Sequence, residues 1–308
     1  MRIGIFDPYL DDLGGGEKYM MTIASCLSKQ HNVDVFWDNN SDLDNLVHRF
    51  SLDLSKIKIV PNIFSSKTPF LKRFIKTQHY DLIIFLSDGS IPIVSCKLLV
   101  HIQQPLEQMQ SESLWDKVKL SRIQSFFCNS LYTRSFIDKK FSLKTAVLYP
   151  PVSFQPKQIK KENIILHVGR FRVRNVSAND YKKQGVMINK FKEMVKNGLN
   201  NWEFVLAVSI QEKDALEFEK MKKNTQGFPI RFLINQTNDK LWDIYSKAKI
   251  YWHATGFGED LNKHPELAEH FGISTVEAMG AGTVPVVINE GGQREIVENG
   301  KNGFLWNS

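Results

Sequence analysis

Two series of short apolar runs constrain the fold of this chain more than any other feature. The runs are rich in Ile, Val and Phe, and each alternates with a longer stretch of mixed polarity. This pattern is typical of strands that are buried in a parallel sheet and alternate with helices. The expected strands are 2–6, 33–37, 57–60, 81–86, 98–101, 125–128 and 145–149, then 164–169, 203–208, 230–234, 249–253, 284–288 and 303–306. The expected helices include 16–29, 185–197, 212–223, 238–247, 273–281 and 292–298.

A proline-rich segment separates the two series. It contains Pro150, Pro151 and Pro156, and prolines make such a segment a semi-rigid linker. The length of 308 residues also suggests two domains. We therefore expect an α/β protein with two doubly wound domains, 1–155 and 156–308. Ligands of such sheets bind beyond the carboxyl ends of the strands, so we expect the domains to face a central cleft that holds the site.

The composition excludes several classes of protein. Hydrophobic residues make up 42% and charged residues 24% of the chain, which is typical of a globular rather than a disordered protein. The excess of 40 basic over 33 acidic residues is mild and comes without a basic tail, so we expect no nucleic-acid partner. No apolar run is long enough for a membrane span, and the first residues lack the apolar segment of an export signal. The expected location is therefore the cytoplasm.

The cysteines predict neither a disulfide framework nor a zinc site. There are three of them, Cys26, Cys96 and Cys128, and no two are close in the sequence. Such spacing fits a reducing compartment, where cysteines serve as small core residues. We accordingly expect no metal ligands.

A glycine-rich segment follows the first predicted strand. Gly14, Gly15 and Gly16 precede Glu17 and open the helix expected over 16–29. Consecutive glycines let backbone amides approach a ligand, and the start of a helix favours anions. A turn that merely needs glycine to bend is an equally good interpretation. The spacing differs from GxGxxG, which disfavours a nicotinamide enzyme.

A second segment, EHFGISTVEAMGAG over 269–282, contains two glutamates and a turn into a helix. Phe271 and Gly272 mark the turn, and the free amides beyond it can hold a phosphate. Glu277 then lies on the first turns of the helix, where it can accept hydrogen bonds from ribose hydroxyls, while Glu269 lies upstream and can face a sugar. The spacing of the two glutamates is not distinctive by itself.

A third segment places cations at the end of the strand that follows the linker. Arg170 ends the run HVGR, and Lys182 and Lys183 precede the next expected helix. Two such cations can neutralise a diphosphate as it departs from a sugar. The alternative is that all three are solvated loop charges.

Together these segments resemble the GT-B glycosyltransferases of family 4. The resemblance rests on GGGE near the start, VLYPPV before the linker, HVGR, EHFGISTVEAMGAG and GGQREIV. It implies two Rossmann-like domains, of which the N-terminal one binds the acceptor and the C-terminal one a UDP- or GDP-linked sugar. It also implies transfer of a hexose, with retention of anomeric configuration and without a metal, to a hydroxyl of a saccharide, lipid-linked or other acceptor.

The resemblance assigns roles to individual residues. Glu269 would bind hydroxyls of the donor sugar, Glu277 the ribose, and His101 would lie near the reacting carbon. The residues assigned to catalysis are His101, Arg170, Lys183 and Glu269. Those assigned to donor binding are Gly15, Gly16, Arg170, Lys182, Lys183, Phe271, Gly272, Ile273 and Glu277. Lys183 is favoured over Lys182 because it immediately precedes a Gln-Gly step, although the insertion 172–180 leaves the alignment open.

Several alternatives remain open at this point. The chain could be a catalytically silent subunit that binds a sugar nucleotide, or a GT-B enzyme of different chemistry such as an epimerase or a phosphorylase. For a transferase, no carboxylate of the N-terminal half stands out as a nucleophile, so front-face displacement is the mechanistic hypothesis.

Two further expectations concern segments outside the motifs. The stretch 69–76 combines apolar and basic residues as a membrane-surface helix does, although a helix packed on its own sheet gives the same pattern. Family members usually continue beyond the strand expected over 303–306, so the resemblance implies a C-terminal domain that lacks a helical extension.

Overall fold

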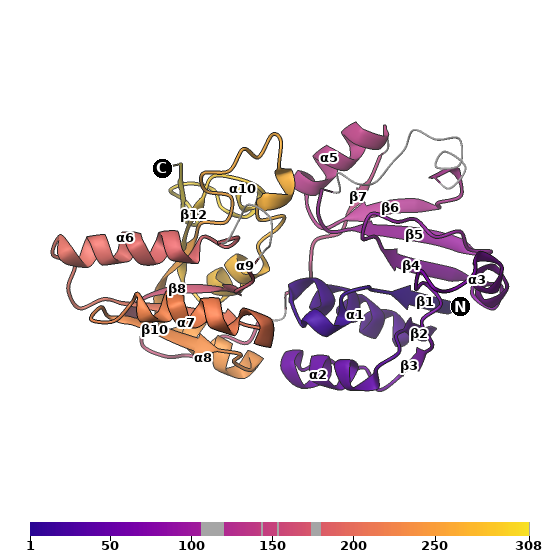
Figure 1. Ribbon diagram of the computed structural model, residues 1–308, viewed down its shortest axis with the longest axis horizontal. Coiled ribbons are helices and arrows are strands. Elements are labelled where there is room, and N and C mark those ends of the chain that lie inside the picture. The colour runs from indigo at the N-terminus through magenta and orange to yellow at the C-terminus, as the bar shows by residue number, and fades with distance from the viewer. Residues whose placement is uncertain (106–119, 143, 153, 174–179, 308) are drawn as a thin grey trace. The chain divides into compact units, whose positions relative to one another are not determined.

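The computed structural model describes residues 1–105, 120–142, 144–152, 154–173 and 180–307. The chain divides into two compact units, Met1–Pro151 and Val152–Ser308, which we call the N-terminal and C-terminal units (Figure 1). The division falls within the proline-rich segment. Each unit is described by itself below. Most of the insertion 172–180 lies outside the described residues.

The described part of the N-terminal unit contains a seven-stranded parallel sheet in the order β3-β2-β1-β4-β5-β6-β7. The strands are β1 (Arg2–Phe6), β2 (Asn32–Phe36), β3 (Ile57–Val60), β4 (Leu82–Leu86), β5 (Lys97–Ile102), β6 (Ser125–Cys128) and β7 (Ala146–Val147). All the strands expected from the apolar runs are present. The last is shorter than predicted because its pairing with β6 covers only two residues.

Helices cover both faces of this sheet. They are α1 (Gly15–Ser28), α2 (Asn40–Phe50), α3 (Phe70–Thr77) and α5 (Leu131–Phe141), with a short 3-10 turn at Leu10–Asp12. Met20 of α1 and Leu46 of α2 belong to one core cluster, together with Ile5 of β1. Ile137 of α5 packs in the other, with Val100 of β5. Each of these helices therefore buries the apolar residues of one face against the sheet, as an amphipathic helix does.

The described part of the C-terminal unit repeats this plan with a six-stranded parallel sheet in the order β10-β9-β8-β11-β12-β13. The strands are β8 (Glu162–Arg170), β9 (Glu203–Ser209), β10 (Ile230–Ile234), β11 (Ala248–His253), β12 (Val284–Ile288) and β13 (Phe304–Trp306). The strand order reverses between β8 and β11, and the carboxyl ends of strands at such a point are where doubly wound sheets bind ligands.

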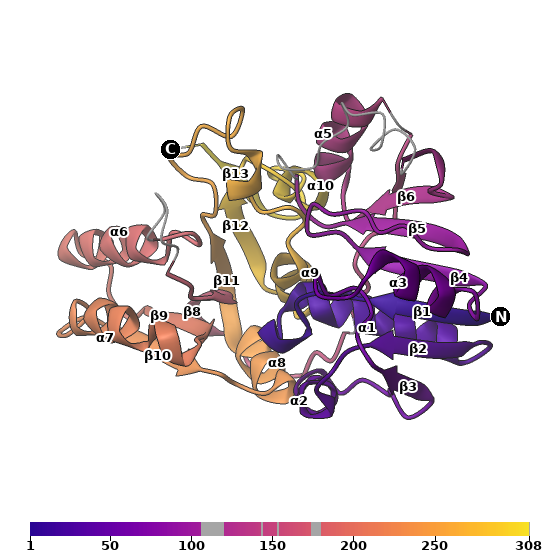
Figure 2. The ribbon, with the colours of Figure 1, turned by 45° about the vertical axis from the view of Figure 1, so that its right-hand side comes forward.

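The helices of the C-terminal unit lie on the two faces of its sheet. They are α6 (Gln184–Lys196), α7 (Ala215–Lys223), α8 (Asn238–Lys247), α9 (Ile273–Gly280) and α10 (Gln293–Ile296), with 3-10 turns at Glu212–Asp214 and Pro265–Leu267. Figure 2 shows α6 and α7 on one face, where Phe191 and Phe218 are buried. On the other face α8 and α9 bury Trp242 and Ala278. In the part of the chain that the structure describes, no helix is long and apolar enough to cross a bilayer.

Candidate active site

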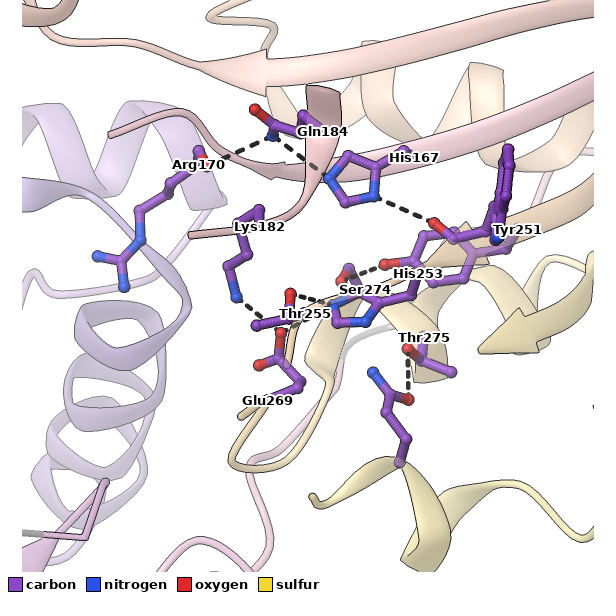
Figure 3. Close-up of polar contacts among 12 residues, drawn as sticks. His167, Arg170, Lys182, Gln184, Tyr251, His253, Thr255, Glu269, Ser274 and Thr275 are labelled. Carbon is purple, nitrogen blue, oxygen red and sulfur yellow. Dashed lines mark hydrogen bonds and ion pairs between the residues drawn. The ribbon is translucent and has the colours of Figure 1, made fainter. Parts of the chain in front are cut away.

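The carboxyl ends of β8 and β11 bring four polar side chains of the C-terminal unit together. Arg170 is the last residue of β8 and His253 the last of β11. Lys182 comes from the loop before α6, and Glu269 from the loop before α9. In Figure 3 the side chains of Arg170 and Lys182 extend in the same direction from the backbone. The strand order thus collects residues that are far apart in the sequence.

Glu269 is the centre of this group. Its Oε2 lies 2.7 Å from Nζ of Lys182 and 2.9 Å from Nε2 of His253. The side chains of Lys182 and Glu269 are only 12% and 18% exposed. Burial raises the pKa of Glu269, but Lys182 and His253 outweigh burial, so this pKa lies well below its usual range. Glu269 is therefore an ionised carboxylate that two donors hold through one oxygen.

The two adjacent lysines, of which the sequence favours Lys183, have different partners in the structure. Lys183 pairs with Glu259, and its backbone is left-handed, with φ of 56°. The reason lies in Asp180, whose carboxylate accepts the backbone N–H groups of Gln184 and Gly185 and so fixes the start of α6. This turn points the adjacent lysines to different partners. Only Lys182 of the two contacts Glu269.

A buried chain of hydrogen bonds supports these strand ends. Nδ1 of His167 donates to the carbonyl of Trp252, 3.1 Å away. The amide Nε2 of Gln184 donates to Nε2 of His167 at 3.3 Å and to the carbonyl of Arg170 at 3.4 Å. Burial lowers the pKa of His167 to about 3, so the ring is neutral and can donate from one nitrogen and accept at the other. The chain ties α6 to β8 and β11 behind the site.

The start of α9 lacks a side-chain cap at its N-cap position. Gly272 precedes the helix with φ of 116°, a conformation that favours glycine, and as a glycine it supplies no capping side chain. Phe271, the residue before it, is buried. The starts of α1 and α6, by contrast, hold their own carboxylates: Glu17 accepts from Gly14 N–H, and Asp180 caps α6. Because Gly272 offers no such carboxylate, the first N–H groups of α9 are a candidate site for an anionic ligand.

The GGQ segment, Gly291 to Gln293, packs against this loop from behind. Gly292 N–H donates to the carbonyl of Glu269 at 2.7 Å, and a Cβ on Gly291 would lie 2.4 Å from the same oxygen. Thr275 donates its hydroxyl to Oε1 of Gln293 at 2.9 Å. Position 291 thus requires glycine, because the backbones of the GGQ segment and of Glu269 approach closely there.

Glu277 lies on α9, as the sequence predicts. It is 8% exposed, and Tyr245 of α8 donates its hydroxyl to Oε2 of Glu277 at 3.1 Å. The hydroxyl groups of Tyr251 and Ser274 lie 2.7 Å apart at the first turn of the same helix. These contacts hold α9 in place relative to β11.

The remaining predicted residues belong to the N-terminal unit. His101 is fully buried on β5, donates Nδ1–H to the carbonyl of Phe127 at 3.2 Å, and has no hydrogen-bond partner for Nε2 among the described residues. Burial lowers the pKa of His101 to about 3, so it is neutral. A Cβ on Gly16 would lie 2.4 Å from Oε1 of Gln103, so a larger residue there would displace this amide group. Gly15 is the first residue of α1.

Three further residues lie at the site without being predicted from the motifs: His253, Thr255 and Gln184. Thr255 Oγ1 lies 3.2 Å from Nε2 of His253. In the sequence, His253 could have been identified as a candidate because it is the last residue of a predicted strand. Gln184 follows the two lysines, but nothing in the sequence shows that it is buried. The described residues contain no group of three His, Cys, Asp or Glu side chains that could hold a metal ion.

The known proteins that this chain resembles in sequence are glycosyltransferases. Residues 151–308 match the family model of glycosyl transferases group 1. The GalNAc-alpha-(1->4)-GalNAc-alpha-(1->3)-diNAcBac-PP-undecaprenol alpha-1,4-N-acetyl-D-galactosaminyltransferase of Campylobacter jejuni is 25% identical over 260 residues, covering 77% of this chain and 68% of that protein. The GDP-Man:Man(3)GlcNAc(2)-PP-Dol alpha-1,2-mannosyltransferase of Xenopus laevis is 30% identical over 202 residues, or 58% of this chain. The match spans only 38% of that mannosyltransferase.

Solved structures share the fold. Anabaena Alr3699/HepE in complex with UDP and glucose has a TM-score of 0.68 at 18% identity, covering 100% of this chain and 86% of that one. A glycosyltransferase from Rickettsia africae has a TM-score of 0.71 at 14% identity, covering 99% and 84%. WaaG, a glycosyltransferase involved in lipopolysaccharide biosynthesis, has a TM-score of 0.59 at 13% identity, covering 99% and 85%. The chain therefore has the GT-B fold of two Rossmann-like domains.

Proposed function

The chain belongs to the group 1 glycosyltransferases, and from that premise we propose that it is a retaining, family 4 enzyme. In this proposal it transfers a hexose from a UDP- or GDP-linked sugar to a hydroxyl of a saccharide or lipid-linked acceptor. The named relatives support this substrate class, because they act on saccharides linked through PP to undecaprenol or dolichol. The observation that carries the proposal is the uncapped start of α9 in the same unit as Arg170, Lys182 and Glu269.

The donor is proposed to bind as a nucleoside diphosphate sugar. The N–H groups around Gly272 and Ile273 would hold a phosphate, and Arg170 and Lys182 would neutralise the diphosphate as it leaves. These cations supply the positive charge, so the proposed reaction needs no metal. Glu269 would accept hydrogen bonds from the sugar hydroxyls, and Glu277 from the ribose.

The proposed chemistry is a front-face displacement. The bond between the anomeric carbon and the leaving phosphate oxygen breaks, and the acceptor oxygen bonds to the same face. The departing phosphate takes the proton of the acceptor hydroxyl. In this proposal the N-terminal unit, expected from the sequence as residues 1–155, binds the acceptor, and His101, Gly15 and Gly16 are its proposed functional residues.

The proposal can be tested by measuring the unfolding temperature of the purified protein with a panel of UDP-glucose, UDP-N-acetylgalactosamine and GDP-mannose. A bound donor raises the unfolding temperature by mass action. Transfer to a saccharide acceptor, followed by NMR of the anomeric proton, then reports retention or inversion. Binding without transfer or hydrolysis would favour a silent subunit, and a changed sugar without transfer would favour an epimerase. A chain that binds none of the donors would contradict the proposal.

A second proposal concerns α3 and a membrane surface. Phe70, Leu71 and Ile75 are 49%, 68% and 57% exposed on this helix, and Lys72 and Lys76 are exposed beside them. Packing on the sheet does not account for these three apolar side chains. We propose that they contact an anionic bilayer in which a lipid-linked acceptor resides. Co-sedimentation with phosphatidylglycerol vesicles should fall on charge reversal at Lys72 and Lys76; unchanged co-sedimentation would contradict the contact.

A further inference from the structure

The two oxygens of Glu269 have different surroundings. Lys182 and His253 both contact Oε2. Oε1 makes no hydrogen bond to any described residue and is not one of the buried polar atoms that lack a partner, so it is open to solvent. Figure 3 shows Oε2 directed toward Lys182 and His253 and the other oxygen directed away from them. The carboxylate thus presents one fixed oxygen and one available oxygen.

His253 is held rigidly where it contacts Glu269. The side chain is 1% exposed, and its ring stacks on Tyr251 at 6.3 Å between centroids. The carbonyl of Trp252, the preceding residue, accepts the hydrogen bond from His167 that fixes β11 against β8. With Nε2–H directed at Oε2 of Glu269, the hydroxyl oxygen of Thr255 at 3.2 Å is a second acceptor for the same hydrogen.

We propose that His253 is a positioning residue that holds Oε2 of Glu269, so that Oε1 is directed at a hydroxyl of the donor sugar. This inference rests on the proposed function. Its importance follows from the role proposed for Lys182. When a donor binds, Lys182 turns to the diphosphate, and the hydrogen bond from His253 is then the contact that still fixes the carboxylate. His253 acts through Glu269 and does not touch the sugar.

The charges around His253 favour a neutral ring. Burial lowers its pKa, and Lys182 lowers it further, whereas Glu269 raises it. His167 on β8 faces it at 6.0 Å between ring centroids, and Tyr251 is the neighbour on its own strand. A neutral ring with the proton on Nε2 suits a donor to Oε2.

The test compares binding of a complete nucleotide sugar with binding of its bare nucleoside diphosphate. The probes are the donor of the panel above that binds most tightly and UDP or GDP to match. His253→Leu should raise the Kd of the nucleotide sugar about 10- to 100-fold, the effect of losing a hydrogen bond to a charged group, while the Kd of the nucleoside diphosphate changes less than about twofold. His253→Gln, whose amide can donate to Oε2, should restore most of the loss. His48→Leu, on the exposed face of α2, is the matched control and should change neither constant.

Each outcome decides between the alternatives. Equal losses for the nucleotide sugar and the nucleoside diphosphate would show a general structural role and overturn the inference, as would an unchanged Kd for the nucleotide sugar. If His253→Leu does not fold, His253→Asn, which is too short to reach Oε2, gives the same test. A wild-type protein that binds no donor of the panel would instead overturn the proposed function, and this inference with it.

Discussion

The first six strands of the two units have the same order, but the units differ in the charge at the point where that order reverses. In the N-terminal unit, β1 is followed by Asp7, a fully buried carboxyl whose pKa is raised well above its usual range by burial and by Glu17. In the C-terminal unit, β8 ends in Arg170 and Lys182 lies in the next loop. The same scaffold therefore carries carboxyl groups at one switch point and cations at the other. The fold sets where a ligand binds, and a few residues set which ligand.

The largest expected effect separates the two adjacent lysines. Lys182→Met should lower the turnover of transfer by about 10²- to 10³-fold, because it removes a charge from the departing diphosphate. Lys183→Met should lower it by less than about tenfold, because Lys183 is engaged with Glu259. Steady-state kinetics with the best donor measures both. Equal losses would remove the distinction between the lysines.

The next prediction concerns the close approach of Gly291 to the backbone of Glu269. Gly291→Ala should lower transfer about 10- to 100-fold, because a Cβ 2.4 Å from the carbonyl of Glu269 displaces this residue from its working position. Gly300→Ala is the matched control: its φ of 77° resembles the 63° of Gly291, but a Cβ there meets nothing within 4 Å. Both variants carry the backbone cost of about 1–2 kcal/mol. Similar activity in the two variants would contradict the steric account.

Acid should destabilise the C-terminal unit more than the N-terminal unit. His167 and His253 have lowered pKa values and are neutral when folded, so stability falls as pH drops below about 6.5. For His167, whose pKa is about 3, the loss is about 1.4 kcal/mol per pH unit, and His253 contributes with the same sign. When the pH falls below the usual pKa range of glutamate, Glu269 adds to the loss of stability, because its own pKa in the folded protein is lowered. The N-terminal unit has His101 with the same sign, but Asp7, whose pKa is raised, regains stability as pH falls.

Hydrogen exchange of β8 and β11 against β1 and β4, at pH 7 and pH 5 and corrected for intrinsic rates, measures this difference. The C-terminal strands should lose more protection on acidification. Equal losses, or a larger loss in the N-terminal strands, would contradict the charge assignment.

The smallest expected effect concerns the carboxylates that cap helices. Asp180→Ala should lower the free energy of unfolding by about 1–2 kcal/mol, because three backbone N–H groups at the start of α6 lose their acceptor. Glu17→Gln should cost less, because an amide oxygen can still accept from Gly14 N–H. Urea unfolding measures both. A larger loss for Glu17→Gln would show that the two caps are not comparable.

Most of the fold could be predicted because parallel strands buried on both faces are continuous apolar runs. The run over 230–234, for example, is the strand Ile230–Ile234. The predicted helix 292–298 is shorter in the structure, Gln293–Ile296, because Val297 already has extended backbone. Apolar runs carry no comparable signal for the ends of short helices.

The site was predictable in its motifs and not in its contacts. Arg170 ends a strand and Gly272 precedes a helix that the runs locate, and Glu269 lies in the loop before that helix. The choice between Lys182 and Lys183 depends on a turn set by Asp180, and two adjacent residues look alike in a sequence. His253 contacts Glu269 only because β11 ends beside the loop before α9, a relation that the strand order creates.

Each core cluster consists of residues from a single unit: Ile5 and Val100 belong to clusters of the N-terminal unit, and Phe191 and Trp242 to clusters of the C-terminal unit. Among the described residues, neither hydrophobic core includes a side chain from the other side of the division after Pro151. Exchange of whole domains between related enzymes at this proline-rich segment therefore leaves both cores intact. In the proposed function the C-terminal unit binds the donor, so a hybrid joined there is expected to inherit its donor preference with that unit and its acceptor preference with the N-terminal unit.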